Sequence, residues 1–347
     1  MNPIRLAPRG SPRRPIIWVS MLILVLAALT LLGACGGSTS SSLNSASPSA
    51  SSGSASSSSA SWTAADLAAV TTDPSLKAML PSSIVSSNNL RVASDIPYPP
   101  WEYYDPATSK NPAGFDYDIS QAIGKKIGIP TSFNETPFDS IILSIKGGKN
   151  DMIMSSMADT VERQQSGVSF VDYAHNGTAF LVLKGNPEGV SNIDSLSGRI
   201  VASENGTTQQ AFLQTWNTQL QAAGKKPITV LALPNEPGAL LAVKSGRAVA
   251  VVQGLSVLAY IAQTTNNGNT FEVVTDPASP NGYYPSTDGI GIVASNTALI
   301  TTVQKALQAL IDGGAYQRIV AKYGLLTVTS AQVNQGPPPT PSASSTP

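Results

Sequence analysis

The segment that organises the chain is residues 153–170, IMSSMADTVERQQSGVSF. An apolar strand over 151–154 leads into it, and the chain then turns through Ser155 and Ser156 and reaches Arg163. Serine hydroxyls and backbone N–H groups at a strand end, followed by a guanidinium, suit a carboxylate, because arginine can bind both carboxylate oxygens with its planar fork. The alternative is a strand, a loop and a solvated helix start with no ligand.

Strands and helices alternate on both sides of this segment, which predicts an α/β protein with parallel strands. The pattern restarts after residue 178, so we expect two lobes with the chain passing between them more than once. A helical lead-in over 62–85 precedes them. The expected strands are 90–94, 131–133, 151–154, 179–183, 199–202, 228–233, 248–252, 271–274 and 289–293, and the expected helices are 119–127, 138–146, 209–222, 237–245, 254–263, 301–311 and 314–322.

Both ends of the chain differ in composition from this folded part. Residues 1–34 have a basic start, an apolar run over 16–32 and small residues before Cys35, as in a secretory signal peptide. The ending resembles a bacterial lipobox, which implies that Cys35 is lipidated and becomes the first mature residue; an ordinary transmembrane helix is the alternative. Residues 35–61 are rich in Ser, Ala and Gly and predict a flexible tether, and 334–347 predict a disordered tail.

The composition argues against several classes of partner. The chain has 21 basic and 21 acidic side chains, and no basic run or aromatic-basic pattern indicates nucleic acid. It has one histidine and one cysteine, so no zinc-ligand cluster and no intramolecular disulfide is expected. We therefore expect no metal and no cofactor.

Several short motifs follow one another along the folded part: DIPYPPWE at 95–102, GFDYD at 114–118, Phe138-Asp139, Gly147 to Asp151, MSSM at 154–157, TVER at 160–163, LSG at 196–198, NGTT at 205–208 and SGR at 245–247. In this order they resemble the bacterial extracellular solute-binding proteins of family 3. The resemblance covers 90–324, essentially the whole folded part.

The resemblance implies a two-lobe clamshell of the type II periplasmic-binding-protein kind, with a two-strand hinge that closes over a ligand. Lobe 1 would be 86–178 plus 289–326, and lobe 2 would be 179–288. The implied function is the extracellular component of an ABC importer, which captures a small polar amino acid and delivers it to a membrane permease. The protein would be a monomer outside the cytoplasm, anchored to the membrane by its lipid.

The resemblance also assigns roles to individual residues. Arg163 matches the carboxylate-binding arginine. The other positions implied at the ligand are Ser156, Ala158, Thr207, Thr208, Asp95, Tyr98, Trp101 and Phe138. Thr207 and Thr208 stand at a predicted helix start, where free N–H groups favour an anion. For Trp101 and Phe138 a plain core role is the alternative, and for Asp95 a loop cap. Asp116 and Asp118 are expected to cap the helix at 119–127.

One position departs from the family pattern. Amino-acid binders of the family place an aspartate for the ligand's ammonium where this chain has Gly254, or Gln253 if the alignment shifts by one. A buried ammonium without a counter-ion is costly. Three explanations stay open: another acid (Glu204, Glu236 or Asp288) substitutes, the ligand is a carboxylate without an amine, or binding is weak.

Two other functions use the same fold. Some relatives are dehydratases of cyclic acids, which need an acid or base in the cleft. Here the single His175 has no evident partner near the expected hinge, so we expect no enzyme activity. Sensors carry a transmembrane and signalling segment, and we expect none after Leu326.

Overall fold

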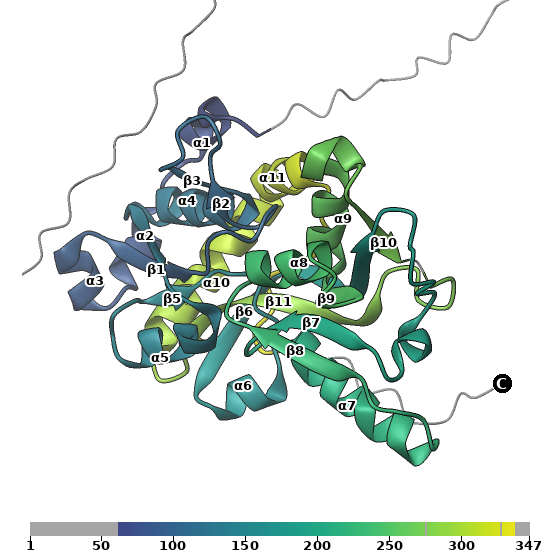
Figure 1. Cartoon of the computed structure of the whole chain (residues 1–347). Helices are drawn as coiled ribbons and strands as arrows, with labels where there is room; N and C mark the ends of the chain where they lie inside the picture. Colours follow the sequence, from purple (N-terminus) through teal and green to yellow (C-terminus); the bar gives the residue numbers. More distant parts are fainter. Residues whose placement is uncertain (1–61, 275, 327, 337–347) are drawn as a thin grey trace, which may run out of the picture. The chain divides into compact units, whose positions relative to one another are not determined.

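Nine strands form one continuous sheet in the part of the chain that the structure describes, in the order β4-β1-β5-β11-β6-β9-β7-β8, with β10 also paired to β6 (Figure 1). The computed structural model describes residues 62–274, 276–326 and 328–336, all within the compact unit Ser57–Pro347. The expected signal peptide, Cys35, the tether and residues 337–347 lie outside the described residues. The strands are β1 Leu90–Ser94, β2 Tyr103–Tyr104, β3 Pro112–Ala113, β4 Thr131–Glu135, β5 Met152–Ile153, β6 Val168–Leu183, β7 Ile200–Glu204, β8 Thr229–Leu233, β9 Ala250–Gly254, β10 Phe271–Val274 and β11 Tyr283–Val293.

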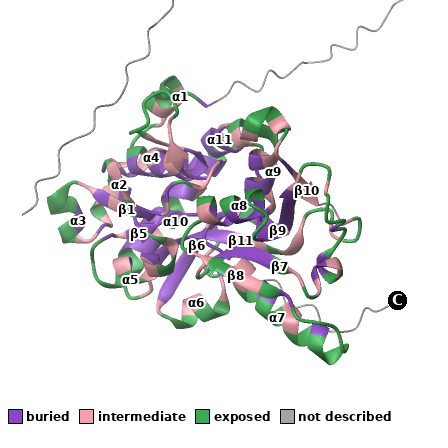
Figure 2. Cartoon of the chain, viewed as in Figure 1, coloured by how far each residue is buried: buried purple, intermediate pink, exposed green. Residues whose placement is uncertain are grey.

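Helices cover the sheet, and their apolar faces supply much of the core (Figure 2). The α-helices are α1 Ala64–Ala69, α2 Pro74–Ala78, α3 Ser82–Ser87, α4 Phe115–Ile127, α5 Ile141–Lys146, α6 Val161–Gln165, α7 Thr208–Ala222, α8 Glu236–Lys244, α9 Leu255–Thr264, α10 Thr297–Asp312 and α11 Ala315–Tyr323. Three 3-10 turns, Phe138–Ser140, Ile193–Leu196 and Thr265–Gly268, complete the set in the described residues. The α/β prediction is confirmed.

Two lobes share the long strands β6 and β11, which form the two-strand hinge. Strands β4, β1 and β5 belong to the first lobe, and β9, β7 and β8 to the second. Near its start β6 pairs with β11 at Phe170↔Gly291, and further along it pairs with β9 at Thr178↔Gly254. The sequence predicted only 179–183 and 289–293 as strands here. Polar residues such as Asp172 and Asn176 interrupt the apolar pattern of β6, but both are buried and the ladder continues through them.

Three strands in each lobe are parallel to one another, so their carboxyl ends meet at one edge of the sheet. In the first lobe β1 pairs parallel with β4 and β5, and in the second β7 pairs parallel with β8 and β9. In open α/β sheets, ligands bind at the carboxyl ends of the strands. The loops after β1, β5 and β7 are therefore the places to look for a site.

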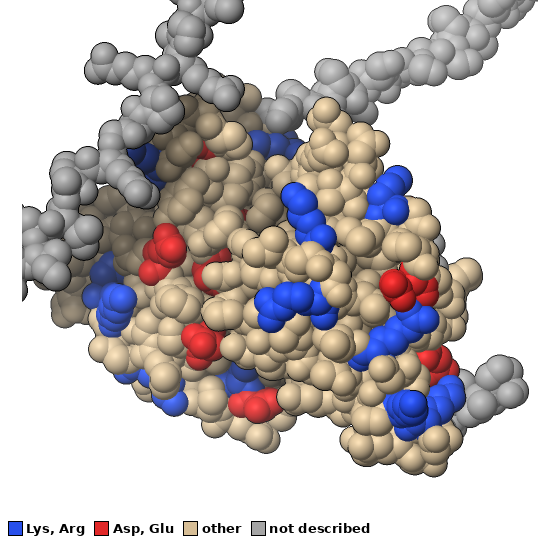
Figure 3. Space-filling view, viewed as in Figure 1, with Lys and Arg blue, Asp and Glu red and all other residues tan. Residues whose placement is uncertain are grey.

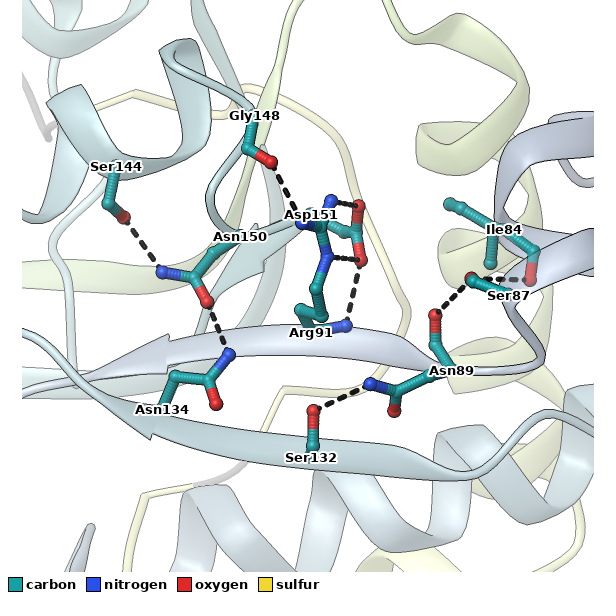
Figure 4. Close-up of polar contacts among 10 residues, drawn as sticks. All are labelled: Ile84, Ser87, Asn89, Arg91, Ser132, Asn134, Ser144, Gly148, Asn150 and Asp151. Atoms are coloured by element: carbon teal, nitrogen blue, oxygen red, sulfur yellow. Dashed lines mark hydrogen bonds and ion pairs between the residues drawn. The ribbon is translucent and has the colours of Figure 1, made fainter.

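A polar cluster fastens the opposite end of the first-lobe sheet (Figure 4). Arg91 and Asp151 form an ion pair at 2.7 Å, and the Arg91 Nη1 also donates to the Gly148 carbonyl at 2.8 Å. Beside it, Asn134 donates to Asn150, whose own amide donates to Ser144. These bonds join β1 and β4 to the loop before β5.

Helix α4 begins earlier than the sequence predicted. Its N-cap is Gly114 at φ +120°, where a side chain would collide with the Trp101 carbonyl at 2.2 Å. Asp116 and Asp118 are thus inside the first turn, and the capping prediction is wrong. Asp118 accepts hydrogen bonds from Lys322 and Tyr323 instead, and Asp116 accepts one from the Ser156 amide.

The segment after residue 327 packs against β6. The Phe170 amide donates to Asn334 Oδ1 at 2.7 Å, the Asn334 amide donates to the Phe170 carbonyl, and the Gly336 amide donates to Asp159 at 2.9 Å. The predicted disordered tail began at 334, so its first three residues are in fact bonded to the first lobe. The sequence did not predict this packing, because the contacts are made by backbone and side-chain amide groups and not by apolar side chains.

Candidate functional site

A pocket lies between the two lobes at the carboxyl ends of the strands. Its lining residues are Asp95, Tyr98, Phe138, Ser155, Ser156, Ala158, Arg163, Glu204, Thr207, Thr208 and Gln209. It thus brings together every predicted site residue except Trp101 and Gln253. On the face shown in Figure 3, positively and negatively charged side chains are interspersed with wide uncharged areas.

Arg163 lies on α6, a short helix that begins where the Thr160 side chain accepts a hydrogen bond from the Arg163 amide. Its guanidinium donates to the Ala158 carbonyl at 2.7 Å in the first lobe and to the Gly206 carbonyl at 3.2 Å in the second. The Phe138 ring lies below it, 5.5 Å from the guanidinium carbon. Desolvation lowers the pKa of Arg163 to about 10, so it is still cationic at neutral pH. Two carbonyls and a ring therefore fix the cation at the junction of the lobes.

Ser155 and Ser156 are hydrogen bonded to buried acidic side chains. Ser156 has φ +41°, a left-handed conformation that costs a non-glycine residue about 1–3 kcal/mol. Its amide donates to Asp116 at 2.9 Å, and its hydroxyl donates to Asp288 of β11 at 2.7 Å. Ser155 donates its hydroxyl to Glu102 at 2.6 Å. Ser156 can thus accept from a ligand, but its own hydrogen is used by Asp288.

The turn between β7 and α7 supplies an anion-binding end in the second lobe. Thr207 is the N-cap of this 15-residue helix: its side chain accepts from the Gln210 amide at 3.1 Å and donates to the Glu204 carbonyl at 2.9 Å. The first amides of a helix have no partner within it and favour an anion. Together with Arg163, this turn can bind a carboxylate from both lobes.

Two carboxyl groups face each other across the same pocket. Asp95 follows β1 in the first lobe, Glu204 ends β7 in the second, and both side chains line the pocket. Glu204 is only 2 % exposed and accepts from the Gln253 amide at 3.2 Å, while its Oε1 has no hydrogen-bond partner. Burial raises the pKa of Glu204 to about 10, and burial also raises the pKa of Asp95. The sequence indicated Glu204 only as one of three acids that could replace the missing aspartate. Its position at the carboxyl end of a predicted parallel strand was the feature that could have singled it out.

The position at which the family places its ammonium-binding aspartate, Gly254, is crowded in this structure. A side chain at Gly254 would place its Cβ 2.4 Å from the amide nitrogen of Asn176. Asn176 is held there because its Oδ1 accepts from the Ser256 hydroxyl at 3.2 Å. Gln253, the alternative position, bonds to Glu204 and does not line the pocket. Of the three candidate acids, Glu204 lines the pocket and Glu236 and Asp288 do not.

Trp101 is a core residue, and its predicted place at the ligand is wrong. Its side chain is 0 % exposed and packs edge-on against Phe115 and Tyr173, with ring centroids 5.4 and 6.1 Å away. Its indole N–H donates to the Ser256 hydroxyl of α9 at 3.0 Å. Trp101 therefore ties a first-lobe loop to the second lobe from behind the pocket.

Other chemistries find little support in the described residues. The exposed His175 lies on β6, with its nearest polar partner the Thr287 hydroxyl at 3.4 Å, and does not line the pocket. Among residues 62–274, 276–326 and 328–336, no three His, Cys, Asp or Glu side chains gather as a metal site. Within the same residues, no helix reaches the length and apolarity that crossing a bilayer requires.

We expect the folded protein to lose stability as the pH rises. Burial raises the pKa of Asp116 to about 6, of Asp172 to about 7, and of Asp288 and Glu236 to about 8. Between pH 5 and 8 the folded state therefore keeps protons that the unfolded chain has lost, and each such proton lowers the free energy of unfolding by about 1.4 kcal/mol per pH unit. Urea unfolding at pH 5, 6.5 and 8 measures this, and Asp288→Asn should flatten the slope. A free energy of unfolding that rises with pH would contradict it.

Comparisons with known proteins identify the family that the chain resembles. The sequence model of the family described as "Bacterial extracellular solute-binding proteins, family 3" matches residues 90–326. The lysine/arginine/ornithine-binding periplasmic protein of Escherichia coli K12 is 27% identical over 74% of this chain and 93% of its own length.

Solved structures give the same result. An ancestral arginine-binding protein bound to arginine is 30% identical, with a TM-score of 0.57 over 68% of this chain and 98% of its own. An ancestral amino acid-binding protein, described as a precursor of cyclohexadienyl dehydratase, is 26% identical, with a TM-score of 0.59 over 70% of this chain and 97% of its own.

Proposed function

The chain belongs to the bacterial extracellular solute-binding proteins of family 3, and on that premise we propose that it is the receptor of an ABC importer for a cationic amino acid, with L-arginine as the ligand to test first. The lobes would close on the ligand and present it to a membrane permease. Two relatives that bind lysine, arginine or ornithine by name support this choice.

The charges of the pocket carry the proposal. One arginine and two carboxyl groups line it, so its formal charge is −1 when all three are ionised. L-arginine has one carboxylate and two cationic groups, and thus a charge of +1 that balances the pocket. Burial keeps Glu204 protonated in the empty pocket at neutral pH, so a neutral amino acid could bind with that proton retained; a cationic ligand would let both carboxyl groups ionise and pair with it.

The residues that line the pocket offer contacts for each part of the same ligand. We assign the ligand carboxylate to Arg163 and to the amides at the start of α7. Tyr98 and Phe138 offer ring faces to the rest of the ligand, and a guanidinium over an aromatic face is favoured by about 0.5–2 kcal/mol. The runner-up ligand is an organic carboxylate without an amine, which would use the Arg163 end alone.

We propose that the chain binds its ligand without transforming it. Catalysis of a dehydration would need an acid or base placed at the reacting atoms. The one histidine of the chain, His175, does not line the pocket.

A binding screen tests the ligand class. The purified full chain is titrated calorimetrically with L-arginine, L-lysine, L-glutamine, L-glutamate and the deaminated keto acid of arginine. We expect L-arginine and L-lysine to bind at least about tenfold more tightly than L-glutamine and L-glutamate. Equal affinity for the keto acid would favour the organic-acid alternative, and tighter binding of L-glutamate would sink the assignment of a cationic ligand.

The sequence features at the ends of the chain complete the proposal. We propose that residues 1–34 are removed, that Cys35 is lipidated, and that 35–61 tether a monomeric receptor outside the cell membrane. We further propose that lobe 1 comprises residues 86–178 and 289–326 and that lobe 2 comprises residues 179–288. Metabolic labelling with a fatty acid tests the anchor: label in the wild type that persists in Cys35→Ser would rule it out.

A further inference from the structure

The two hinge strands change register beside the pocket. On β11, Asp288 and Gly289 are consecutive. Their partners on β6 are Ala174 and Asp172, so the register skips Tyr173 between them. Such a β-bulge bends the strand and re-aims side chains, and bulges are frequent next to functional sites. The bulge therefore gives the side chains beside it directions that a regular ladder would not.

Both strands use these side chains to hold Ser156, which lines the pocket. Asp288 of β11 accepts a hydrogen bond from the Ser156 hydroxyl at 2.7 Å. The Tyr173 hydroxyl of β6 donates to one oxygen of Asp116 at 2.6 Å, and the other oxygen of Asp116 accepts from the Ser156 amide at 2.9 Å. The three side chains that hold Ser156 are all buried. Ser156 is thus fixed at its amide and at its hydroxyl by groups tied to the hinge.

The backbone of β11 also fixes the loop that follows Ser156. The Asp159 amide donates to the Thr287 carbonyl at 2.8 Å, and the Gly289 amide donates to the Met157 carbonyl at 2.9 Å. Ser156 itself has φ +41°, in the left-handed region that residues with a side chain rarely adopt. Such a conformation persists only where the surrounding contacts determine it, so the shape of this loop depends on β11.

The bond to Asp288 decides what the Ser156 hydroxyl can offer a ligand. A serine hydroxyl has one hydrogen to donate and two lone pairs that accept. Since Asp288 takes the hydrogen, Ser156 presents an acceptor to the pocket, which suits an ammonium group and not a carbonyl oxygen. The bond does not need a charge on Asp288: burial raises the pKa of this carboxyl to about 8, and a protonated carboxyl keeps an oxygen that accepts.

We propose that Asp288 is a positioning residue for ligand specificity, which fixes the Ser156 hydroxyl as an acceptor for the α-ammonium group of an amino acid. This deepens the proposed function and rests on it. Gly254 has no room for a side chain that could meet the ammonium. The α-ammonium lies one carbon from the carboxylate assigned to Arg163, and Ser156 is in the same loop as Ala158, whose carbonyl holds that arginine. Asp288 does not line the pocket and acts through Ser156.

Calorimetry with two matched ligands tests the role of Asp288. The full chain is titrated with L-arginine and with its deaminated keto acid, which has a carbonyl oxygen in place of the ammonium. In Asp288→Ala the Ser156 hydroxyl is free to turn, so we expect the affinity for L-arginine to fall about tenfold and that for the keto acid to fall less than about threefold. Asp288→Asn keeps an oxygen that accepts from Ser156 and should restore the affinity for L-arginine to within about threefold of the wild type.

A double-mutant cycle with L-arginine alone separates this role from a structural one. Ser156→Ala should lower the affinity for L-arginine about as much as Asp288→Ala does. Adding Asp288→Ala to Ser156→Ala should then cost no further affinity, because no hydroxyl is left to orient. A purely structural role for Asp288 would give losses that add in the cycle and would weaken both ligands alike.

The outcomes distinguish this inference from the proposed function. If the wild type binds neither ligand, the proposed function fails and the inference fails with it. If L-arginine binds the wild type and Asp288→Ala equally well, or if Asp288→Ala weakens both ligands alike, the proposed function stands and the role of Asp288 is overturned. Should Asp288→Ala not fold, Asp288→Leu, of similar size but without an oxygen, takes its place. An equal loss of both ligands in Ser156→Ala would overturn the inference without any change at Asp288.

Discussion

Replacing Arg163 with alanine should lower the affinity for L-arginine by about 30-fold to several-thousand-fold, which corresponds to about 2–5 kcal/mol for the loss of a buried charge-assisted pair. The guanidinium is held by the Ala158 and Gly206 carbonyls and backed by the Phe138 ring, so it is oriented before a ligand arrives. Its removal takes away the donor for the ligand carboxylate and also one bond between the lobes. Isothermal titration on the folded variant measures the loss.

Two companion variants separate charge from geometry. Arg163→Lys keeps the charge but loses the planar fork, so we expect an intermediate loss of affinity. Arg199→Ala removes the same charge from a surface position, where the arginine pairs with Glu188 at 3.2 Å, and should bind as the wild type does. Wild-type affinity in Arg163→Ala would mean that the carboxylate lies elsewhere and that the pocket is misassigned.

The sequence predicted the elements whose patterns are local. The apolar strands β1, β5 and β7 and the amphipathic helices α7, α10 and α11 lie within a few residues of their expected bounds. The strand-to-helix turn at Thr207 could be predicted because a hydroxyl before an amphipathic run is a typical N-cap. The same reasoning failed at α4, where tertiary contacts occupy Asp116 and a glycine begins the helix.

The pairing of strands that lie far apart in the sequence could not be predicted from local patterns. β6 runs unbroken through Asp172, Asn176 and Gly177, which look like a loop. Strand β11 pairs with this stretch from one side, and the carbonyls of Gln332 and Leu326 accept from the Asp172 and His175 amides on the other. Which acid enters the pocket is equally non-local. Asn176, 78 positions earlier in the chain, fills the space beside Gly254, and Glu204 reaches the pocket from the neighbouring strand β7.

Trp101 belongs to a motif that borders the pocket, but its side chain packs in the core and does not line the pocket. We expect Trp101→Ala to lower the free energy of unfolding by about 3–5 kcal/mol, since it empties a fully buried site between Phe115 and Tyr173. Trp101→Phe keeps a ring there and removes the hydrogen bond to Ser256, for a smaller loss of about 1–3 kcal/mol. Urea unfolding measures both.

A double-mutant cycle decides between the core role and a ligand role. If the indole N–H acts through Ser256, then Trp101→Phe combined with Ser256→Ala should cost less than the sum of the two single losses, because the second change no longer leaves a buried group unpaired. Titration with L-arginine well below the unfolding temperature should show a loss for Trp101→Phe much smaller than for Arg163→Ala. Two results together would support a ligand-binding role for Trp101: a loss of affinity in Trp101→Phe as large as that of Arg163→Ala, and losses of unfolding free energy that add in the double-mutant cycle.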